Sequence, residues 1–423
     1  EMTFRVAVSW IVPKADGEGE AMPTSPGIRE AIRQGSWIRK MFEEGARLKS
    51  AKGADNVFDF SLGNPYGAPP DELLGEMQKL LASPPDDLHR YMPNAGFPDV
   101  RKRIAASLAR TIGLPFTGDL VIMTTGAAGA LNVALQAILS PGDEVIVIAP
   151  YFAEYLFYLR TVGGVPVVAE SSGEFQLDMG AIRAALSDRT KAVILNTPNN
   201  PSGAVYPRDA LLALDAVLGE REKRTGNPVY VLSDEPYRKI VYPGYAFFPP
   251  ASALRNTLIA YSHSKDLNVP GERIGYLAVS PRAADAEEIS EACVFCNRVL
   301  GFVNAPSLMQ RAVAVVQNLE PDFPVYRANR DVLVATLAEA GFSVVPPGGA
   351  FYLFPRSPSE DEMEFVAAAR EENILVVPGR GFGREGHFRI AFCVPPDTVA
   401  RSLPAWKRLG RRFFPGRRTG AAR

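Results

Sequence analysis

The sequence contains little cysteine and little histidine. Three cysteines and three histidines in 423 residues argue against a disulfide framework and favour a reducing compartment. Cys293 and Cys296 form a single CxxC pair on a stretch of helical character, with no second pair to complete a zinc site, so we interpret them as buried free thiols. The histidines, His89, His263 and His387, are too scattered to suggest a metal site. We therefore expect no metal.

The sequence also lacks net charge and long apolar runs. A net charge of -1 gives no excess of positive charge that would attract nucleic acid or an anionic membrane surface. No apolar run approaches the ~20 residues of a membrane helix. The N-terminal FRVAVSWIVP is short, and no convincing cleavage site follows it. We predict a cytoplasmic protein without nucleic-acid or membrane partners. Residues 1–21 and the basic C-terminal KRLGRRFFPGRRTGAAR are expected to be poorly ordered, solvated ends.

Seven short apolar runs between about Asp119 and Val279 alternate with stretches of helical period such as GALNVALQAIL. The runs are DLVIMTT, EVIVIAP, VPVVAE, AVILNTP, PVYVLSDE, TLIAYSHS and IGYLAV. Most are apolar throughout, which is typical of strands that helices cover on both faces. The pattern predicts an α/β fold with a doubly wound, mainly parallel seven-stranded sheet.

The two ends of the chain have a different pattern from the middle. Residues 22–60 carry helical segments, and residues 321–423 mix helices with short strands such as ILVVPG. We expect 61–320 to form a large cofactor-binding domain, and 321–423 to form a smaller α+β domain with which the N-terminal helices pack. A chain of this length has room for both domains.

Small, polar and charged residues follow the predicted strands at their carboxyl ends, where open α/β sheets bind ligands. Each feature alone also has a structural explanation. A glycine at the start of a helix can let the backbone approach a phosphate, or it can simply make a turn. An aromatic residue can stack on a ligand ring or fill the core. A buried carboxylate costs free energy unless it is paired or solvated. In chain order these residues are Gly126, Phe152, Asn200, Asp234, Tyr237, Ser262, Ser264, Lys265 and Arg273.

Three motifs in this order resemble those of one enzyme family. They are the N-P-x-G turn of NTPNNPSG, the D-x-x-Y strand end of LSDEPY, and the S-x-x-K…R element of SHSKDLNVPGERIG. The chain resembles the class I/II, fold type I aminotransferases of the aspartate aminotransferase superfamily, from about Ile28 to the final helix. The resemblance implies an enzyme that uses pyridoxal 5'-phosphate, bound to a lysine as a Schiff base, to move an amino group from an L-amino acid to a 2-oxo acid.

The resemblance implies catalytic roles for Lys265, Asp234 and Tyr237. Lys265 would carry the cofactor and move the substrate proton, and its partly buried, cation-rich setting should lower the pKa of its amine. Asp234 would hold the ring nitrogen protonated. Asn200 and Tyr237 would hydrogen-bond the phenolic oxygen of the ring, and Phe152 would stack on it.

The resemblance also implies a phosphate site and a substrate site. The phosphate site would consist of Gly126, Ala127, Ala128, Ser262, Ser264 and Arg273. Tyr91 matches a tyrosine that reaches the phosphate of the neighbouring subunit, which implies a homodimer with shared active sites. Arg389 would bind the substrate α-carboxylate as a planar bidentate pair, with Asn200 beside it and the backbone of Gly63 over the substrate.

One position departs from part of the family. In a subgroup specific for dicarboxylates, a lysine stands where this chain has Ala128, and the segments NVFDFS and VLGFVNAP offer mostly apolar or neutral groups. Burying a second carboxylate without a partner is costly. We therefore expect neutral or apolar amino donors to react faster than aspartate, with glutamate or 2-oxoglutarate admitted through a rearrangement on domain closure.

The sequence leaves other activities open. A β-elimination C–S lyase or a cyclopropane-carboxylate synthase has the same fold and nearly the same cofactor contacts, and we favour transamination over both. A transcription regulator with an aminotransferase-like domain needs a DNA-binding domain of ~70 residues and a basic face, and we expect neither here. The amino donor, the keto-acid acceptor and the pathway are not indicated.

Overall fold

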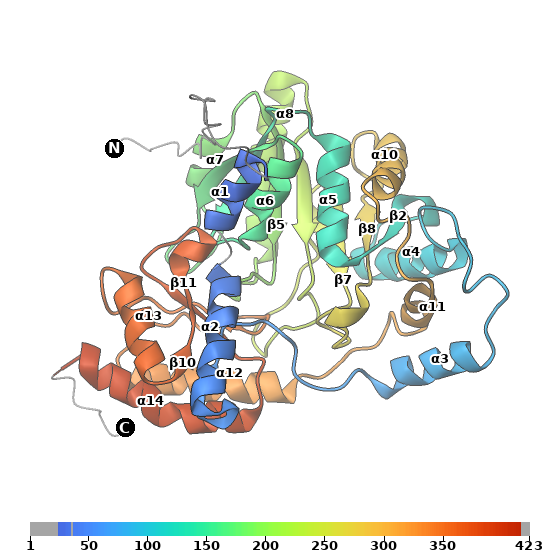
Figure 1. Cartoon of the computed structure of the whole chain (residues 1–423). Helices are drawn as coiled ribbons and strands as arrows, with labels where there is room; N and C mark the ends of the chain where they lie inside the picture. The colour runs from blue at the N-terminus through green and yellow to red at the C-terminus, as the bar shows by residue number, and fades with distance from the viewer. Residues whose placement is uncertain (1–23, 35–36, 416–423) are drawn as a thin grey trace.

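The computed structural model describes residues 24–34 and 37–415 (Figure 1). The predicted extension over 1–21 lies outside these residues, as does the end of the chain beyond residue 415. In the part of the chain that is described, no helix is long and apolar enough to cross a membrane.

A seven-stranded sheet forms the centre of the molecule, in the order β2-β8-β7-β6-β5-β3-β4. Its strands are β2 (Val121–Thr124), β3 (Glu144–Ala149), β4 (Val165–Glu170), β5 (Thr190–Asn196), β6 (Tyr230–Asp234), β7 (Thr257–Ser262) and β8 (Gly275–Val279). Strand β8 runs antiparallel to both of its neighbours, and the other pairs are parallel. The prediction of a mainly parallel seven-stranded sheet is confirmed, strand by strand.

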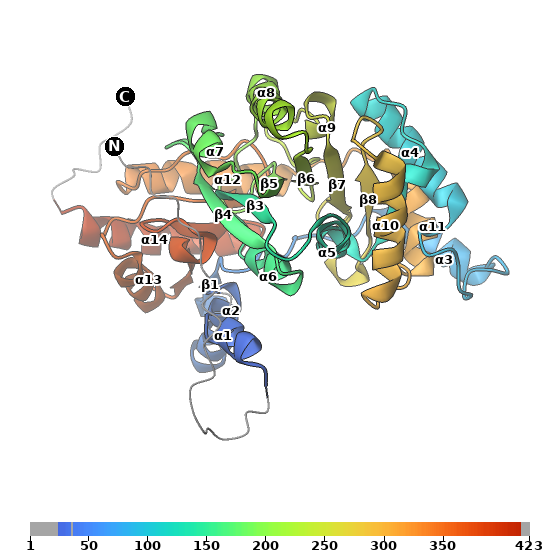
Figure 2. The same ribbon diagram turned by 90° about the horizontal axis from the view of Figure 1, so that it is seen from above.

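Helices cover both faces of this sheet (Figure 2). The first layer consists of α5 (Gly126–Ile138), α6 (Glu154–Thr161) and α10 (Ala286–Val299), and the other face is covered by α4 (Pro98–Ile112), α7 (Met179–Ala185), α8 (Arg208–Thr225), α9 (Pro250–Ala253) and α11 (Ser307–Val315). Alternate residues of β3 enter the two cores: Val145 and Val147 pack with the first layer, and Ile146 and Ile148 pack with α7 and α8. Because side chains alternate across a strand, a strand covered on both faces must be apolar throughout.

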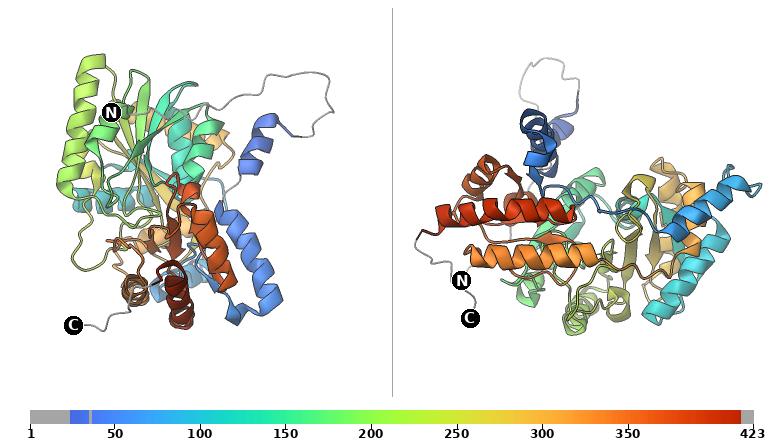
Figure 3. Two further views of the ribbon diagram at one scale, coloured as in Figure 1. Left: turned by 90° about the vertical axis from the view of Figure 1, so that its left-hand side faces the viewer. Right: turned by 90° about the horizontal axis from the view of Figure 1, so that it is seen from below.

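The C-terminal part builds a second core. Its strands are β9 (Tyr352–Leu353), β10 (Ile374–Leu375), β11 (Val377–Pro378) and β12 (Phe388–Ala391), and its helices are α12 (Pro324–Glu339), α13 (Glu362–Glu371) and α14 (Pro396–Phe413). Helices α12 and α14 lie side by side (Figure 3, right). Their buried faces enclose an aromatic cluster in which Phe388 stacks on Trp406, with the ring planes 16° apart.

Part of the N-terminal segment lies against this C-terminal part. The segment contains α1 (Pro26–Gln34), α2 (Trp37–Lys52), β1 (Phe58–Asp59) and α3 (Asp71–Ala82), of which α2 and β1 contact the C-terminal part and α3 packs on α11. Strand β1 pairs in parallel with β10, although more than 300 residues separate them in sequence, and α2 runs beside the C-terminal helices (Figure 3, left). The division of the chain into domains at residues 61 and 321 stays a prediction.

The expectation of a solvated C-terminus is wrong for residues 407–413, which belong to helix α14. The basic residues are on the exposed face of this helix, where Arg408 pairs with Glu372 and Arg412 pairs with Glu371. On its other face Leu409 is buried in the aromatic core. Amphipathic spacing, rather than net basic charge, determines the structure of this segment.

Candidate active site

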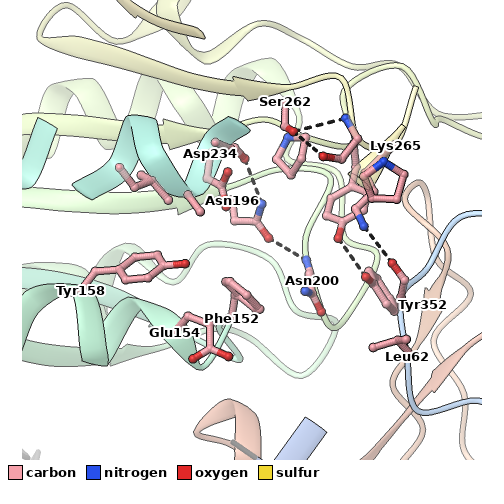
Figure 4. Close-up of a pocket in the computed structure, with 18 of the residues that line it drawn as sticks. Leu62, Phe152, Glu154, Tyr158, Asn196, Asn200, Asp234, Ser262, Lys265 and Tyr352 are labelled. Carbon is pink, nitrogen blue, oxygen red and sulfur yellow. Dashed lines mark hydrogen bonds between the residues drawn. The ribbon is translucent and has the colours of Figure 1, made fainter. Parts of the chain in front are cut away.

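A cavity of about 340 Å³ opens at the carboxyl ends of β5, β6 and β7, beside the start of α5 (Figure 4). Strand β5 ends at Asn196, which pairs in register with Asp234 at the end of β6. The structure places most of the predicted site residues around this cavity. They are Gly63, Ala127, Ala128, Phe152, Asn200, Asp234, Tyr237, Ser262, Ser264, Lys265, Arg273 and Arg389.

Lys265 follows the end of β7 and extends into the cavity. Its Nζ donates a hydrogen bond to the backbone oxygen of Gly63 at 2.8 Å. Burial, with smaller contributions from the nearby charges of Arg273 and Arg389, lowers the pKa of this amine to about 8, although Cys393 opposes the shift. A substantial share of the amine is therefore neutral near pH 8, and the neutral amine is the form that can act as a nucleophile or a base.

Asp234 has one carboxylate oxygen bonded and one free. The hydroxyl of Tyr155 donates a hydrogen bond to Oδ2, whereas buried Oδ1 has no partner among the described residues. Burial raises the pKa of this carboxyl to about 7, although the bond from Tyr155 opposes the shift. A buried acceptor without a partner is costly, so the position fits a ligand that brings a charged or neutral N–H donor, as a protonated pyridine ring does.

Gly126 begins helix α5 with a φ of +77°, a conformation that favours glycine. A Cβ added here would lie 3.0 Å from Nη2 of Arg273 and 3.2 Å from Oγ of Ser262, so the backbone, the guanidinium and the hydroxyls face one small space. Oγ of Ser264 is 2.8 Å from Oγ of Ser262. Serine hydroxyls, a guanidinium and the positive end of a 13-residue helix fit a phosphate group.

Arg389, in β12, is almost fully buried. Its Nη1 donates to Oδ1 of Asn200 at 3.0 Å and its Nη2 donates to the backbone oxygen of Ser61 at 2.6 Å, while Nε has no partner among the described residues. No carboxylate of these residues forms an ion pair with it. A buried guanidinium whose charge is not balanced by a carboxylate of the described residues fits an anionic ligand, such as a substrate carboxylate.

Three tyrosines at the site were missed by sequence reasoning. Tyr155 and Tyr158 lie one turn apart on α6, and their i, i+3 spacing after Phe152 is a signal that could have placed both on one face. Phe152 lines the cavity and packs edge-on against Tyr155, with ring centroids 5.6 Å apart. Tyr352, on β9, lines the cavity and touches the hydroxyl of Tyr237. It belongs to the apolar run AFYLF, and nothing in the sequence distinguishes it from the aromatic residues of the core.

Tyr91 is the predicted site residue that lies apart from the others. Its side chain is 93% exposed, and it does not line the cavity of its own chain.

The cysteines match their interpretation, because Cys293 and Cys296 are buried free thiols on α10. Within the described ranges, no group of three or more histidine, cysteine, aspartate or glutamate side chains could hold a metal ion.

Comparison with known proteins identifies the family. The family model "Aminotransferase class I and II" matches residues 55–405. The aspartate/prephenate aminotransferase of Thermus thermophilus is 35% identical over 76% of this chain and 84% of its own length, and the aspartate aminotransferase of Geobacillus stearothermophilus is 30% identical over 85% and 92%. An aminotransferase structure from Eubacterium rectale superposes with a TM-score of 0.90, at 36% identity, over 93% of this chain and all of the other. The chain belongs to the class I and II aminotransferases, which depend on pyridoxal phosphate.

Proposed function

We propose that this enzyme holds pyridoxal phosphate in the cavity, with Asp234 at the ring nitrogen, Asn200 and Tyr237 at the ring oxygen, and Phe152 against the ring. The phosphate would lie at the start of α5, against Gly126, Ala127, Ala128, Ser262, Ser264 and Arg273. The observation that best supports this arrangement is the buried Oδ1 of Asp234, which has no partner among the described residues. Asp234 ends β6, and Lys265 follows the end of the neighbouring strand β7. When bound, the cofactor supplies an aldehyde that bonds an amine and a ring that withdraws electrons.

The protein groups position the substrate and move its proton. Arg389 binds the substrate α-carboxylate, and its hydrogen bond to Asn200 fixes the plane of the guanidinium. Lys265, displaced by the substrate amine, would take the proton from the substrate α-carbon and return it to the carbon on the other side of the amine nitrogen, because its lowered pKa keeps part of the lysine amine neutral. The carboxylate of Asp234 would hold the ring nitrogen protonated, and this would stabilise the negative charge that develops on the substrate carbon.

We propose further that neutral or apolar amino donors are preferred. Of the described residues that line the cavity, Lys265, Arg273 and Arg389 are the cationic ones, and the proposed arrangement uses all three. Leu62, Leu131 and Ala128 supply apolar wall, and no further cation among these residues faces a second substrate carboxylate. The relatives named for aspartate and prephenate would therefore differ from this enzyme in side-chain preference.

Measuring kcat/KM for aspartate, alanine, methionine and phenylalanine with one fixed acceptor tests this preference. The largest value is expected for a neutral donor, because an unpaired buried carboxylate raises the transition-state energy for aspartate. Ala128→Lys should raise kcat/KM for aspartate by roughly tenfold, the effect of ~1.4 kcal/mol from one new ion pair in a partly solvated site. If the unaltered enzyme prefers aspartate by tenfold or more, the proposed preference is incorrect.

We propose a homodimer in which Tyr91 completes the phosphate site of the partner. The loop that carries Tyr91 is fastened to residues 297–304: the side chain of Asn94 donates to the backbone of Val303, and that of Asn297 donates to the backbone of Asn94. The same region exposes the apolar side chains of Phe295 and Val299. An exposed tyrosine beside an apolar patch supports a subunit contact here.

Tyr91→Phe is expected to weaken cofactor retention by about 1–2 kcal/mol, roughly 5- to 30-fold in the dissociation constant, because one hydrogen bond to a charged group is lost. The measurement is cofactor release from the loaded enzyme during dilution. Tyr245→Phe, at another exposed tyrosine, should leave retention unchanged. A monomer that is fully active at assay concentration would rule out the shared site.

We propose a cytoplasmic location and the expected division into domains. The three cysteines are all free and buried, which suits a reducing compartment. The division at residues 61 and 321 is supported by a hydrophobic core around Trp406 that consists mostly of residues beyond 321, and by the pairing of β1 with β10.

A further inference from the structure

Two tyrosine hydroxyls meet at the wall of the cavity (Figure 4). The Oη atoms of Tyr237 and Tyr352 are 2.8 Å apart, and their rings meet edge to face, with centroids 5.6 Å apart. Both side chains are buried. Burial raises the pKa of both phenols, that of Tyr352 to about 12, so each hydroxyl carries one proton at neutral pH.

Each phenol has one proton, so only one of the two can donate to the other. Among the described residues, the hydroxyl of Tyr352 bonds only that of Tyr237. If Tyr237 were the donor, the proton of Tyr352 would be buried without an acceptor, which is costly. When Tyr352 donates, the proton of Tyr237 is free to point at a ligand.

The position of Tyr352 is fixed from two sides. A Cβ on Gly63 would lie 2.0 Å from its hydroxyl, so the hydroxyl fills the space beside that glycine. The guanidinium of Arg389 lies over its ring, 4.7 Å from the centroid. The ring therefore has little freedom to rotate its hydroxyl away from Tyr237, and the direction of the hydrogen bond is preorganised.

We propose that Tyr352 is a positioning residue that donates its proton to Tyr237 and so directs the proton of Tyr237 to the ring oxygen of the cofactor. The inference rests on the proposed role of Tyr237 and deepens it. A hydrogen bond accepted by Tyr237 makes its hydroxyl a stronger donor, because bonds in a chain polarise one another. Tyr352 thus affects the cofactor only through its hydrogen bond to Tyr237.

The test is a pH titration of the absorbance of the loaded enzyme, which reports the proton shared between the ring oxygen and the lysine nitrogen. A donor to the ring oxygen stabilises its negative charge, so weakening that donor raises the apparent pKa of the shared proton. Tyr352→Phe should move the midpoint upward by roughly 0.3–1 pH unit, and Tyr237→Phe should move it further. In the double variant the midpoint should equal that of Tyr237→Phe alone, because Tyr352 acts only through Tyr237.

Tyr242→Phe is the matched control. It removes another buried hydroxyl from the same aromatic core, one that donates to the backbone oxygen of Ala350, and it should lower the melting temperature without moving the midpoint. The inference fails if Tyr237→Phe moves the midpoint and Tyr352→Phe does not, or if the two shifts add in the double variant. If Tyr237→Phe leaves the midpoint unchanged, the proposed role of Tyr237 is wrong and the inference fails with it.

Discussion

Lys265→Ala is expected to abolish covalent attachment of the cofactor and to lower turnover by several orders of magnitude. The variant loses both the nucleophile and the group that moves the substrate proton, and the two effects multiply. Of the described residues that line the cavity, Lys265 is the one lysine. Lys239 cannot substitute for it, because its ammonium is bound by the backbone oxygens of Gln317 and Leu319.

The measurements are the visible absorbance of the purified enzyme and the rate of its amino-transfer half-reaction. Lys102→Ala, at an exposed position on α4, is the control and should match the unaltered enzyme in both. Retention of covalent cofactor by Lys265→Ala, or turnover within about tenfold of the unaltered enzyme, would mean that another group carries the chemistry.

Asp234→Ala is expected to leave the cofactor bound but to slow abstraction of the α-proton strongly, by roughly 10²–10³-fold. This is the size of effect seen when one preorganised group that stabilises transition-state charge is removed. Without the carboxylate, the ring nitrogen loses its proton and the ring withdraws electrons less well. The phosphate contacts and Lys265 remain, so the cofactor is retained.

The half-reaction rate with a single amino donor, followed by stopped-flow absorbance, measures this effect. Glu235→Gln is the matched control, because Glu235 is the next buried carboxylate but bonds Ser233 and Arg238 and does not line the cavity. It should leave the rate within a few-fold of the unaltered value. An unchanged rate in Asp234→Ala would mean that a different residue holds the ring nitrogen.

The sequence predicts the sheet and the strand-end residues because both depend on local signals. Strands covered on both faces are continuous apolar runs, so β3 and β5 can be recognised from composition alone. The carboxyl ends of parallel strands meet at one edge, so Asp234 and Lys265 could be placed together before their contacts were known.

The residues that the sequence does not reveal depend on long-range packing. The bond between Tyr237 and Tyr352 joins positions 115 residues apart, and a tyrosine in an aromatic run looks the same whether its hydroxyl faces the core or a cavity. Tyr155 cannot be recognised from the sequence either, because its role in the site depends on a hydrogen bond to Asp234, which lies 79 residues away in the sequence. The helical end of α14 was missed because its basic residues suggested solvation, whereas burial of Leu409 determines its structure.

The most direct test of the central claim is to find which lysine carries the cofactor. The loaded enzyme is reduced with borohydride, which makes the bond between the lysine and the cofactor permanent, and is then digested and analysed by mass spectrometry. The account predicts the phosphopyridoxyl group on Lys265, in a peptide that contains SHSKDLNVPGER. Stoichiometric labelling of a different lysine, with Lys265 unmodified, would contradict it.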